Sequence, residues 1–236
     1  MLETRALCKR YGDQIALDAL DLKVDSGEVV CLLGANGAGK TTTLNLLLGF
    51  LAPTSGEARV EEVVVQSDPQ AARARLGYLP EVVQLYPLLS GLETLRYFAD
   101  LSGRPRPADD ELHRMLSQVG LQRDAHGRRV AGYSKGMRQK LGLAIALSKG
   151  ARALLLDEPL SGLDPKAANE LVALVRRLAA DGHAVLAVTH DIFRAQQMAD
   201  RIGIMRQGRL VDMLDPRAMS AAEIEALYVH HLRDVA

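Results

Sequence analysis

The sequence lacks an excess of charge of either sign, because its 236 residues include 29 Lys and Arg and 29 Asp and Glu. A neutral chain produces no overall field that attracts nucleic acid or an anionic membrane surface. The charge balance therefore argues against a nucleic-acid-binding protein.

Cysteines and long apolar runs are scarce as well. The two cysteines, Cys8 and Cys31, do not have metal-ligand spacing, and Cys31 lies in an apolar run typical of a buried strand. No segment approaches the ~18 to 20 apolar residues needed to cross a bilayer, and the N-terminus lacks the apolar stretch of a secretory signal. We therefore expect a soluble, cytoplasmic chain.

The first chemical motif that the sequence does contain is GANGAGKT at residues 34–41. It lies between an apolar segment typical of a strand (29–33) and a predicted helix from about residue 39 to 48. The motif has the spacing G-x-x-x-x-G-K-[ST], in which backbone N–H groups and a helix N-terminus hold phosphate. A tight turn that contains Gly and Lys by chance is the alternative, and the flanking strand and helix disfavour it.

The loop predicts a nucleotide site in which each polar side chain has a role. We expect Lys40 to reach the β- and γ-phosphates, Thr41 to offer its hydroxyl to Mg²⁺ and Thr42 to contact the α-phosphate. The loop residues that we expect to contact the nucleotide are Asn36, Gly37, Ala38, Gly39, Lys40, Thr41 and Thr42.

Two acidic residues, Asp157 and Glu158, follow a second apolar segment at 153–156. Ligands of open α/β sheets bind outside the carboxyl ends of the strands, so these residues are candidates for the same site. We expect Asp157 to hold Mg²⁺ through water and Glu158 to take a proton from the attacking water. An Asp-Glu pair is otherwise most often the solvated start of a loop.

A third apolar segment, 184–188, is followed by Thr189, His190 and Asp191. If the strands are parallel, His190 lies at the same edge of the sheet as the phosphate loop and Asp157. We expect His190 to hydrogen-bond the γ-phosphate or the attacking water. A surface or helix-capping histidine is the alternative, and the convergence of three strand ends disfavours it.

The segment GYSKGMRQK at 132–140 predicts a second anion site. Ser134 is a good N-cap, and apolar residues follow at helical spacing, so the hydroxyl of Ser134 and the N–H of Gly136 lie at a helix N-terminus. The phosphate loop already has a helix N-terminus of its own. We therefore expect the second one to serve the nucleotide of another copy, with two chains packed head to tail; a plain N-cap without a ligand is the alternative.

In this order the motifs resemble those of the ATP-binding subunits of ABC transporters, over nearly the whole chain. The segments that resemble the Walker A loop, the signature, Walker B and the D-loop are 34–41, 133–137, 154–159 and 161–164, and His190 resembles the switch histidine. The resemblance implies an ATPase that uses ATP and Mg²⁺. It also implies that Tyr11 stacks on adenine and that Asp164 contacts the nucleotide.

Two positions depart from the family pattern. Lys135 stands where the signature usually has its first glycine, and Gly136 remains available for close approach of a phosphate. Glu81 stands where the family usually has glutamine, and its carboxylate is expected near Mg²⁺. Both departures resemble the export-type branch, and residues 77–103 are similar to the ATPase of the copper-processing transporter that matures nitrous oxide reductase.

The resemblance implies partners: a second ATPase subunit, identical or related, and a polytopic membrane subunit that places the chain on the inner face of the membrane. The apolar residues beside Glu81 suit a helix of that subunit, although loop packing explains them equally well. These residues are Leu85, Tyr86, Leu88 and Leu89. No segment specifies the cargo or the direction of transport.

We predict an α/β fold, a P-loop NTPase core with a mostly parallel sheet, an edge antiparallel β-subdomain and an inserted α-helical subdomain. The whole chain, 1–236, forms one ABC ATPase domain in this prediction. Residues 1–80 and 151–215 make the core and β-subdomain, 81–150 the helical signature subdomain and 216–236 a C-terminal helix.

Two other classes of protein share parts of this pattern. ABC-type ATPases of translation or DNA repair have tandem cassettes or coiled-coil insertions and often basic surfaces, whereas this chain has one cassette, no heptad run and zero net charge. A small P-loop kinase would need a phosphoacceptor site in place of YSKGM and SGLD. Co-purification with a polytopic membrane protein distinguishes the transport subunit from both.

Overall fold

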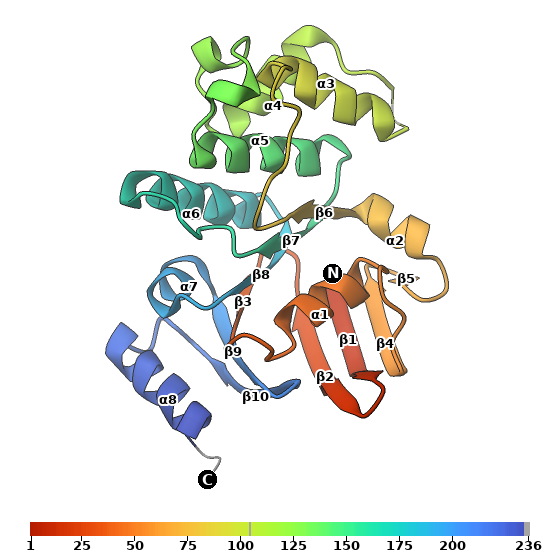
Figure 1. The fold of residues 1–236 in the computed structure, drawn as a ribbon, viewed down its shortest axis with the longest axis vertical. Coiled ribbons are helices and arrows are strands. Elements are labelled where there is room, and N and C mark those ends of the chain that lie inside the picture. Colours follow the sequence, from red (N-terminus) through yellow and green to blue (C-terminus); the bar gives the residue numbers. More distant parts are fainter. Residues whose placement is uncertain (104, 234–236) are drawn as a thin grey trace.

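The computed structural model describes residues 1–103 and 105–233, which form two sheets surrounded by helices (Figure 1). The larger sheet has six strands in the order β10-β9-β3-β8-β7-β6. All neighbours are parallel except β10, which pairs antiparallel with β9. The strands are β3 (Val29–Leu33), β6 (Leu76–Leu79), β7 (Ala153–Asp157), β8 (Ala184–Thr189), β9 (Arg201–Arg206) and β10 (Arg209–Leu214).

The central strands of this sheet are apolar because both of their faces are covered. In β3, Val29 and Cys31 belong to a core cluster with the helices on one face, whereas Val30 and Leu32 belong to the cluster shared with the smaller sheet. The continuous run VVCLL therefore fills two cores at once.

The smaller sheet is antiparallel and has the order β2-β1-β4-β5. Buried and exposed residues alternate along much of β2, where Leu20, Leu22 and Val24 are buried, because only one face of this sheet is packed. The strands are β1 (Leu2–Tyr11), β2 (Gln14–Val24), β4 (Ser55–Val60) and β5 (Val63–Val64).

Three of the helices, α3, α4 and α5, lie together at one end of the molecule, away from the small sheet (Figure 1). Leu95, Leu112 and Leu116 of α3 and α4 pack in one cluster with Leu141 and Leu143 of α5. The helices are α1 (Lys40–Leu47), α2 (Pro69–Arg75), α3 (Gly91–Leu101), α4 (Asp109–Gln118), α5 (Lys135–Ser148), α6 (Pro165–Ala180), α7 (Ile192–Met198) and α8 (Ala221–Arg233).

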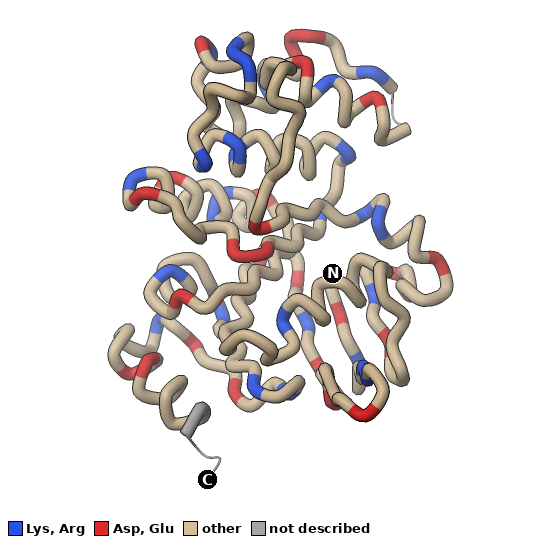
Figure 2. The backbone as a smooth tube through the Cα atoms, in the orientation of Figure 1, with Lys and Arg blue, Asp and Glu red and all other residues tan. Residues whose placement is uncertain are grey.

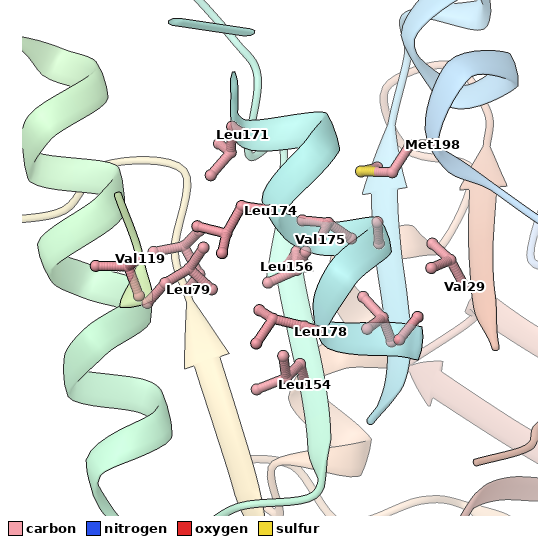
Figure 3. Close-up of a cluster of buried hydrophobic side chains, with 14 of the residues drawn as sticks. Val29, Leu79, Val119, Leu154, Leu156, Leu171, Leu174, Val175, Leu178 and Met198 are labelled. Atoms are coloured by element: carbon pink, nitrogen blue, oxygen red, sulfur yellow. The ribbon is translucent and has the colours of Figure 1, made fainter. Parts of the chain in front are cut away.

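Helix α6 covers one face of the main sheet and fixes the strands that carry the acidic residues. Leu174, Val175 and Leu178 of α6 lie against Leu154 and Leu156 of β7 (Figure 3). Each fully buried leucine contributes about 1.5–3 kcal/mol to folding, so this contact holds the end of β7 firmly in place.

The predicted fold class is confirmed: a mostly parallel α/β sheet, an antiparallel β-sheet and a group of helices inserted between β6 and β7. Helix α2 was not predicted, although Asp68 accepts a hydrogen bond from Ala71 N (2.8 Å) and Pro69 follows it, a common helix start.

The C-terminal helix predicted for 216–236 begins later, at Ala221, and residues 234–236 lie outside the described part of the chain. Ser220 accounts for the later start, because its hydroxyl accepts from Glu223 N (3.3 Å) while Glu223 Oε2 accepts from Ser220 N (2.7 Å). Among the described residues, none of the helices combines the length and hydropathy that crossing a bilayer requires.

Candidate active site

A cleft of about 680 Å³ lies at the carboxyl ends of β3, β7 and β8. It brings together residues that the sequence predicted from five separate segments, together with Gln14 and Ala16, which the sequence did not predict. The predicted residues that line it are Tyr11, Asn36, Gly37, Ala38, Gly39, Lys40, Thr41, Thr42, Glu81, Asp157, Glu158 and His190.

The phosphate loop is pressed against neighbouring strands, which explains its glycines. A Cβ at Gly39, whose φ is +106°, would lie 2.7 Å from Ala16 O. A Cβ at Gly34 would lie 2.7 Å from Met205 O. Side chains at these positions would collide with backbone, so the loop conformation requires glycine at both.

The hairpin turn between β9 and β10 packs against the phosphate loop. Gly208, with φ +80°, donates from its N–H to Ala38 O (3.0 Å) and accepts from Asp18 N (2.9 Å). A Cβ at Gly208 would lie 2.7 Å from Ala16 O. This turn therefore joins the phosphate loop to the small sheet, and glycine is required where the three segments meet.

Lys40 lies beneath the loop and is only 8% exposed. Its ammonium donates to Gly34 O (2.5 Å) and Ala35 O (3.1 Å). Burial lowers the pKa of Lys40, and the nearby carboxylates of Glu158 and Asp157 act in the opposite direction. The side chain is thus at the cleft with two of its three ammonium donors engaged by these carbonyl groups, which leaves one donor for a phosphate.

Glu158 adopts a backbone conformation that is unusual for a residue with a side chain, with φ +43°. Its carboxylate accepts from Thr189 Oγ1 (2.9 Å) and lies 2.8 Å from His190 Nδ1. Such backbone conformations cost of order 1–3 kcal/mol and occur where the surrounding structure imposes them, often at active sites. The end of β8 therefore fixes the orientation of the Glu158 carboxylate and of the His190 ring.

Asp157 lies beside two other carboxylates at the end of β7. Burial raises its pKa, and the charges of Glu158 and Glu81 raise it further, whereas the hydroxyl of Tyr78 and the charge of Lys40 lower it. The Tyr78 hydroxyl donates to Asp157 Oδ2 over 3.4 Å, and burial beside Asp157 raises the pKa of Tyr78 to about 12. A cation bound beside Asp157 would reduce the repulsion between these three carboxylates.

Glu81 connects this edge of the sheet to helix α5. Its carboxylate accepts from Ser161 Oγ (3.4 Å), and its carbonyl oxygen accepts from Gln139 Nε2 (3.2 Å). Ser161 lies in the loop after Glu158, so the segment at Glu81 is held from both the acidic loop and α5.

The remaining predicted residues lie outside the lining of this cleft. Ser134 is exposed and caps α5, with Oγ accepting from Met137 N (3.2 Å). Asp164 caps α6, with Oδ1 accepting from Ala167 N (2.9 Å). Gly136 is buried, and a Cβ there would lie 3.0 Å from Ala167 Cβ, so the packing of α5 on α6 is itself a reason for glycine.

Four further residues belong to this site although the sequence predicted no role for them: Thr189, Tyr78, Ser161 and Gln139. Thr189 was visible at the end of a predicted strand, next to His190. Tyr78 could not be identified, because its contact depends on β6 lying beside β7, where Leu79 pairs with Leu156. No local pattern in the sequence specifies that pairing.

Comparison with known proteins gives a consistent result. The family model described as ABC transporter matches residues 17–161. An uncharacterized ABC transporter ATP-binding protein of Bacillus subtilis, YxlF, is 40% identical over 211 residues, 89% of this chain and 69% of its own length. The daunorubicin/doxorubicin resistance ATP-binding protein DrrA of Streptomyces peucetius is 37% identical over 89% of this chain and 64% of its own. The Nod factor export ATP-binding protein I of Burkholderia lata is 34% identical over 94% of this chain and 73% of its own.

Solved structures agree with the relatives. The dimeric post-hydrolysis structure of the ATP-binding cassette MJ0796 bound to ADP and Pi superposes with a TM-score of 0.80 and 25% identity, over 93% of this chain and 100% of that one. An ATP-binding subunit of an ABC transporter superposes with a TM-score of 0.82 and 29% identity, over 97% and 99%. The chain therefore belongs to the ABC transporter family as an ATP-binding subunit, and it is an ATPase.

Proposed function

We propose that two copies of this subunit, or one copy and a related subunit, hold ATP between them and drive a separate polytopic membrane subunit by closing and reopening. One observation carries this proposal: Ser134 at the start of α5 is exposed and lies outside the chain's own cleft, which is lined by the predicted phosphate contacts of 36–42. In a head-to-tail pair, Ser134 Oγ and Gly136 N–H of one copy would complete the cleft of the other.

Within each cleft the chain's own residues have distinct roles. The backbone of 36–42 and the Lys40 ammonium hold the phosphates, and Tyr11, 48% exposed beside Lys9 Nζ (5.1 Å from the ring centroid), stacks on the adenine. Glu158 accepts a proton from the attacking water, and His190 orients the water or the γ-phosphate. Asp164, which caps α6, also contacts the nucleotide held between the two copies in this proposal.

The donor set at the cleft fits Mg²⁺. The Thr41 hydroxyl and the carboxylates of Asp157 and Glu81 are hard oxygen ligands, and their crowding favours a cation. In the described part of the chain, no group of three or more His, Cys, Asp or Glu side chains is placed to hold a metal ion alone. That suits Mg²⁺, which usually takes one or two carboxylates and completes its shell with phosphates and water. When bound, the ion neutralises charge on the phosphates.

The contact with the membrane subunit lies beside Glu81 in this proposal. Leu88 and Tyr86 are 75% and 52% exposed, and Leu85 and Leu89 are partly exposed next to them. Apolar side chains exposed together suit a helix of the partner. That contact would hold the chain at the inner face of the membrane.

Export is the direction that the relatives favour, because one is named for Nod factor export and another for drug resistance.

The division into a core with β-subdomain (1–80 and 151–215), a helical subdomain (81–150) and a C-terminal segment (216–236) is part of the proposal. The resemblance of 77–103 to the nitrous oxide reductase copper transporter stays a prediction, which copurification with that membrane subunit would test.

The Glu158→Gln substitution tests the paired arrangement directly. It removes the proton acceptor but keeps the shape of the side chain, so ATP hydrolysis should fall by about 10²- to 10⁴-fold while nucleotide still binds. Gel filtration with Mg²⁺ and ATP should then show a dimer that ADP does not support. A Glu158→Gln protein that stays monomeric in the presence of all candidate partners, or that hydrolyses ATP normally, would contradict the proposal.

A further inference from the structure

A second cleft, of about 550 Å³, lies between α6 and the ends of α4 and α5. It shares no lining residue with the cleft at the phosphate loop, although its lining includes Asp164, which the proposed function places near the nucleotide of the pair. Its walls come from the face of α6 that begins at Lys166, from the segment that follows α4, and from Met137 and Lys140 of α5. A volume of this size is in the range of small-molecule sites, roughly 300–1,000 Å³.

Several residues that line the cleft are small, which leaves room between α6 and the segment after α4. Gly120, with φ +76°, follows α4, and Ala125, Ala167 and Ala173 line the same space. Buried Leu121 and Leu174 form an apolar part of the wall.

The charged residues of the lining are four cations, Arg128, Lys140, Lys166 and Arg177, and two acids, Asp164 and Glu170. Figure 2 shows basic and acidic positions gathered where α6 lies beside α5. The lining therefore carries an excess of two positive charges, in a chain whose net charge is zero.

Most of the negative charge in the lining is already engaged. Glu170 Oε2 accepts from Lys140 Nζ (2.7 Å), and Asp164 caps α6. Arg177 donates to Gln118 O (2.5 Å) and Arg128 to Gly132 O (3.2 Å), both of which are uncharged acceptors. Lys166 makes no hydrogen bond or ion pair within the described part of the chain.

We propose that this cleft binds a small organic dianion, a phosphate monoester or a dicarboxylate with an apolar body. The anionic groups would meet Arg128, Lys166 and Arg177, and the apolar body would lie on Leu121 and Leu174. Guanidinium groups suit phosphate and carboxylate because they offer two parallel donors.

Such a ligand bridges α6 of the core to the segment after α4 and to α5. Because α5 begins directly after its cap Ser134, a bound dianion restrains the end that we propose reaches the partner's nucleotide. This consequence rests on the proposed function, whereas binding in the cleft does not.

Titration with phenyl phosphate, a dianion at about pH 8, tests the proposal in the Lys40→Ala protein, which weakens competition from the phosphate loop. We expect saturable binding by calorimetry and slower amide exchange in 118–122 and 166–177. The double substitution Arg128→Gln and Lys166→Gln should weaken binding at least about tenfold. Ala173→Trp, at an exposed position of α6, should abolish binding by filling the space while it keeps every charge.

Arg114→Gln is the matched control, because Arg114 is an exposed cation on α4 outside the cleft. It should leave the affinity unchanged, and thermal melting should verify that all variants fold. Neutral benzyl alcohol should not bind, and inorganic phosphate should bind more weakly than phenyl phosphate. Absence of phenyl phosphate binding, or equal affinity in the Ala173→Trp protein, would overturn the proposal. The assay contains neither ATP nor a partner, so its failure leaves the proposed transport function untouched.

Discussion

Two helix N-termini of this chain, those of α1 and α5, carry the proposed phosphate donors but differ in their surroundings. Helix α1 begins at Lys40 inside a cleft lined by residues of β1, β2 and β7, by His190 after β8 and by Glu81. Helix α5 begins after the exposed Ser134, and Ser134 is outside the lining of that cleft. One terminus lies inside a pocket, and the other has its capping serine at the surface.

The difference indicates how the chain divides its chemistry. The chain itself orients the Glu158 carboxylate. Glu158 follows β7, and its carboxylate is held by Thr189 at the end of β8 and lies beside His190. Ser134 is fixed only by its own cap and by the packing of α5. We therefore expect substitutions near α1 to act within one protomer and substitutions at Ser134 to act on a partner.

The largest effect is expected at α1, with Lys40→Ala. Loss of the ammonium removes a charge-assisted contact to the phosphates, so the affinity for ATP should fall by about a hundredfold or more. Fluorescence titration with a labelled nucleotide measures this. An affinity within a few-fold of the original protein would show that the α1 pocket does not hold the phosphates.

A smaller effect is expected at α5, with Ser134→Ala. Both this substitution and Ser90→Ala remove a serine cap, at α5 and α3 respectively, and each should lower stability by about 1 kcal/mol. Only Ser134→Ala should slow ATP hydrolysis, by about 10- to 100-fold, because of the two serines only Ser134 is proposed to contact a phosphate.

Thermal melting and steady-state ATPase assays separate the two contributions of Ser134. Equal loss of activity in the Ser134→Ala and Ser90→Ala proteins would show that Ser134 only caps α5. The N-terminus of α5 would then have no role at the partner's nucleotide.

The smallest effect is expected from Thr189→Val, which keeps the shape of the side chain but removes the hydroxyl that donates to Glu158. The carboxylate loses one of its two orienting contacts, so kcat should fall by about three- to tenfold. The KM for ATP should stay the same, because Thr189 is outside the phosphate loop. A change in KM alone would place Thr189 in nucleotide binding.

The sequence alone predicted the parts of the site that depend on short-range patterns. Gly34 to Thr41 forms a continuous motif, and Asp157 and His190 each follow an apolar strand whose parallel pairing was implied by the intervening helices. The Ser134 cap was predicted for the same reason, because a cap and its helix are adjacent in the chain.

Contacts that depend on strand order or on the spacing between helices were not predicted. Tyr78 reaches Asp157 only because β6 and β7 are neighbours, and Gly208 meets Ala38 only because β9 lies beside β3. The cleft beside Lys166 is lined by residues of α6, α5 and the segment after α4, which tertiary packing brings together. Such features are set by tertiary packing, which no local pattern encodes.

Mixing two impaired variants is the most direct test of the claim that each nucleotide lies between two protomers. A Lys40→Ala protomer keeps its Ser134, and a Ser134→Ala protomer keeps its phosphate loop, so a mixed dimer has one complete site although neither parent dimer has any. The account predicts that ATPase activity, measured across mixing ratios, rises severalfold above the average of the parents and peaks near equal amounts. Activity that equals that average at every ratio would contradict it.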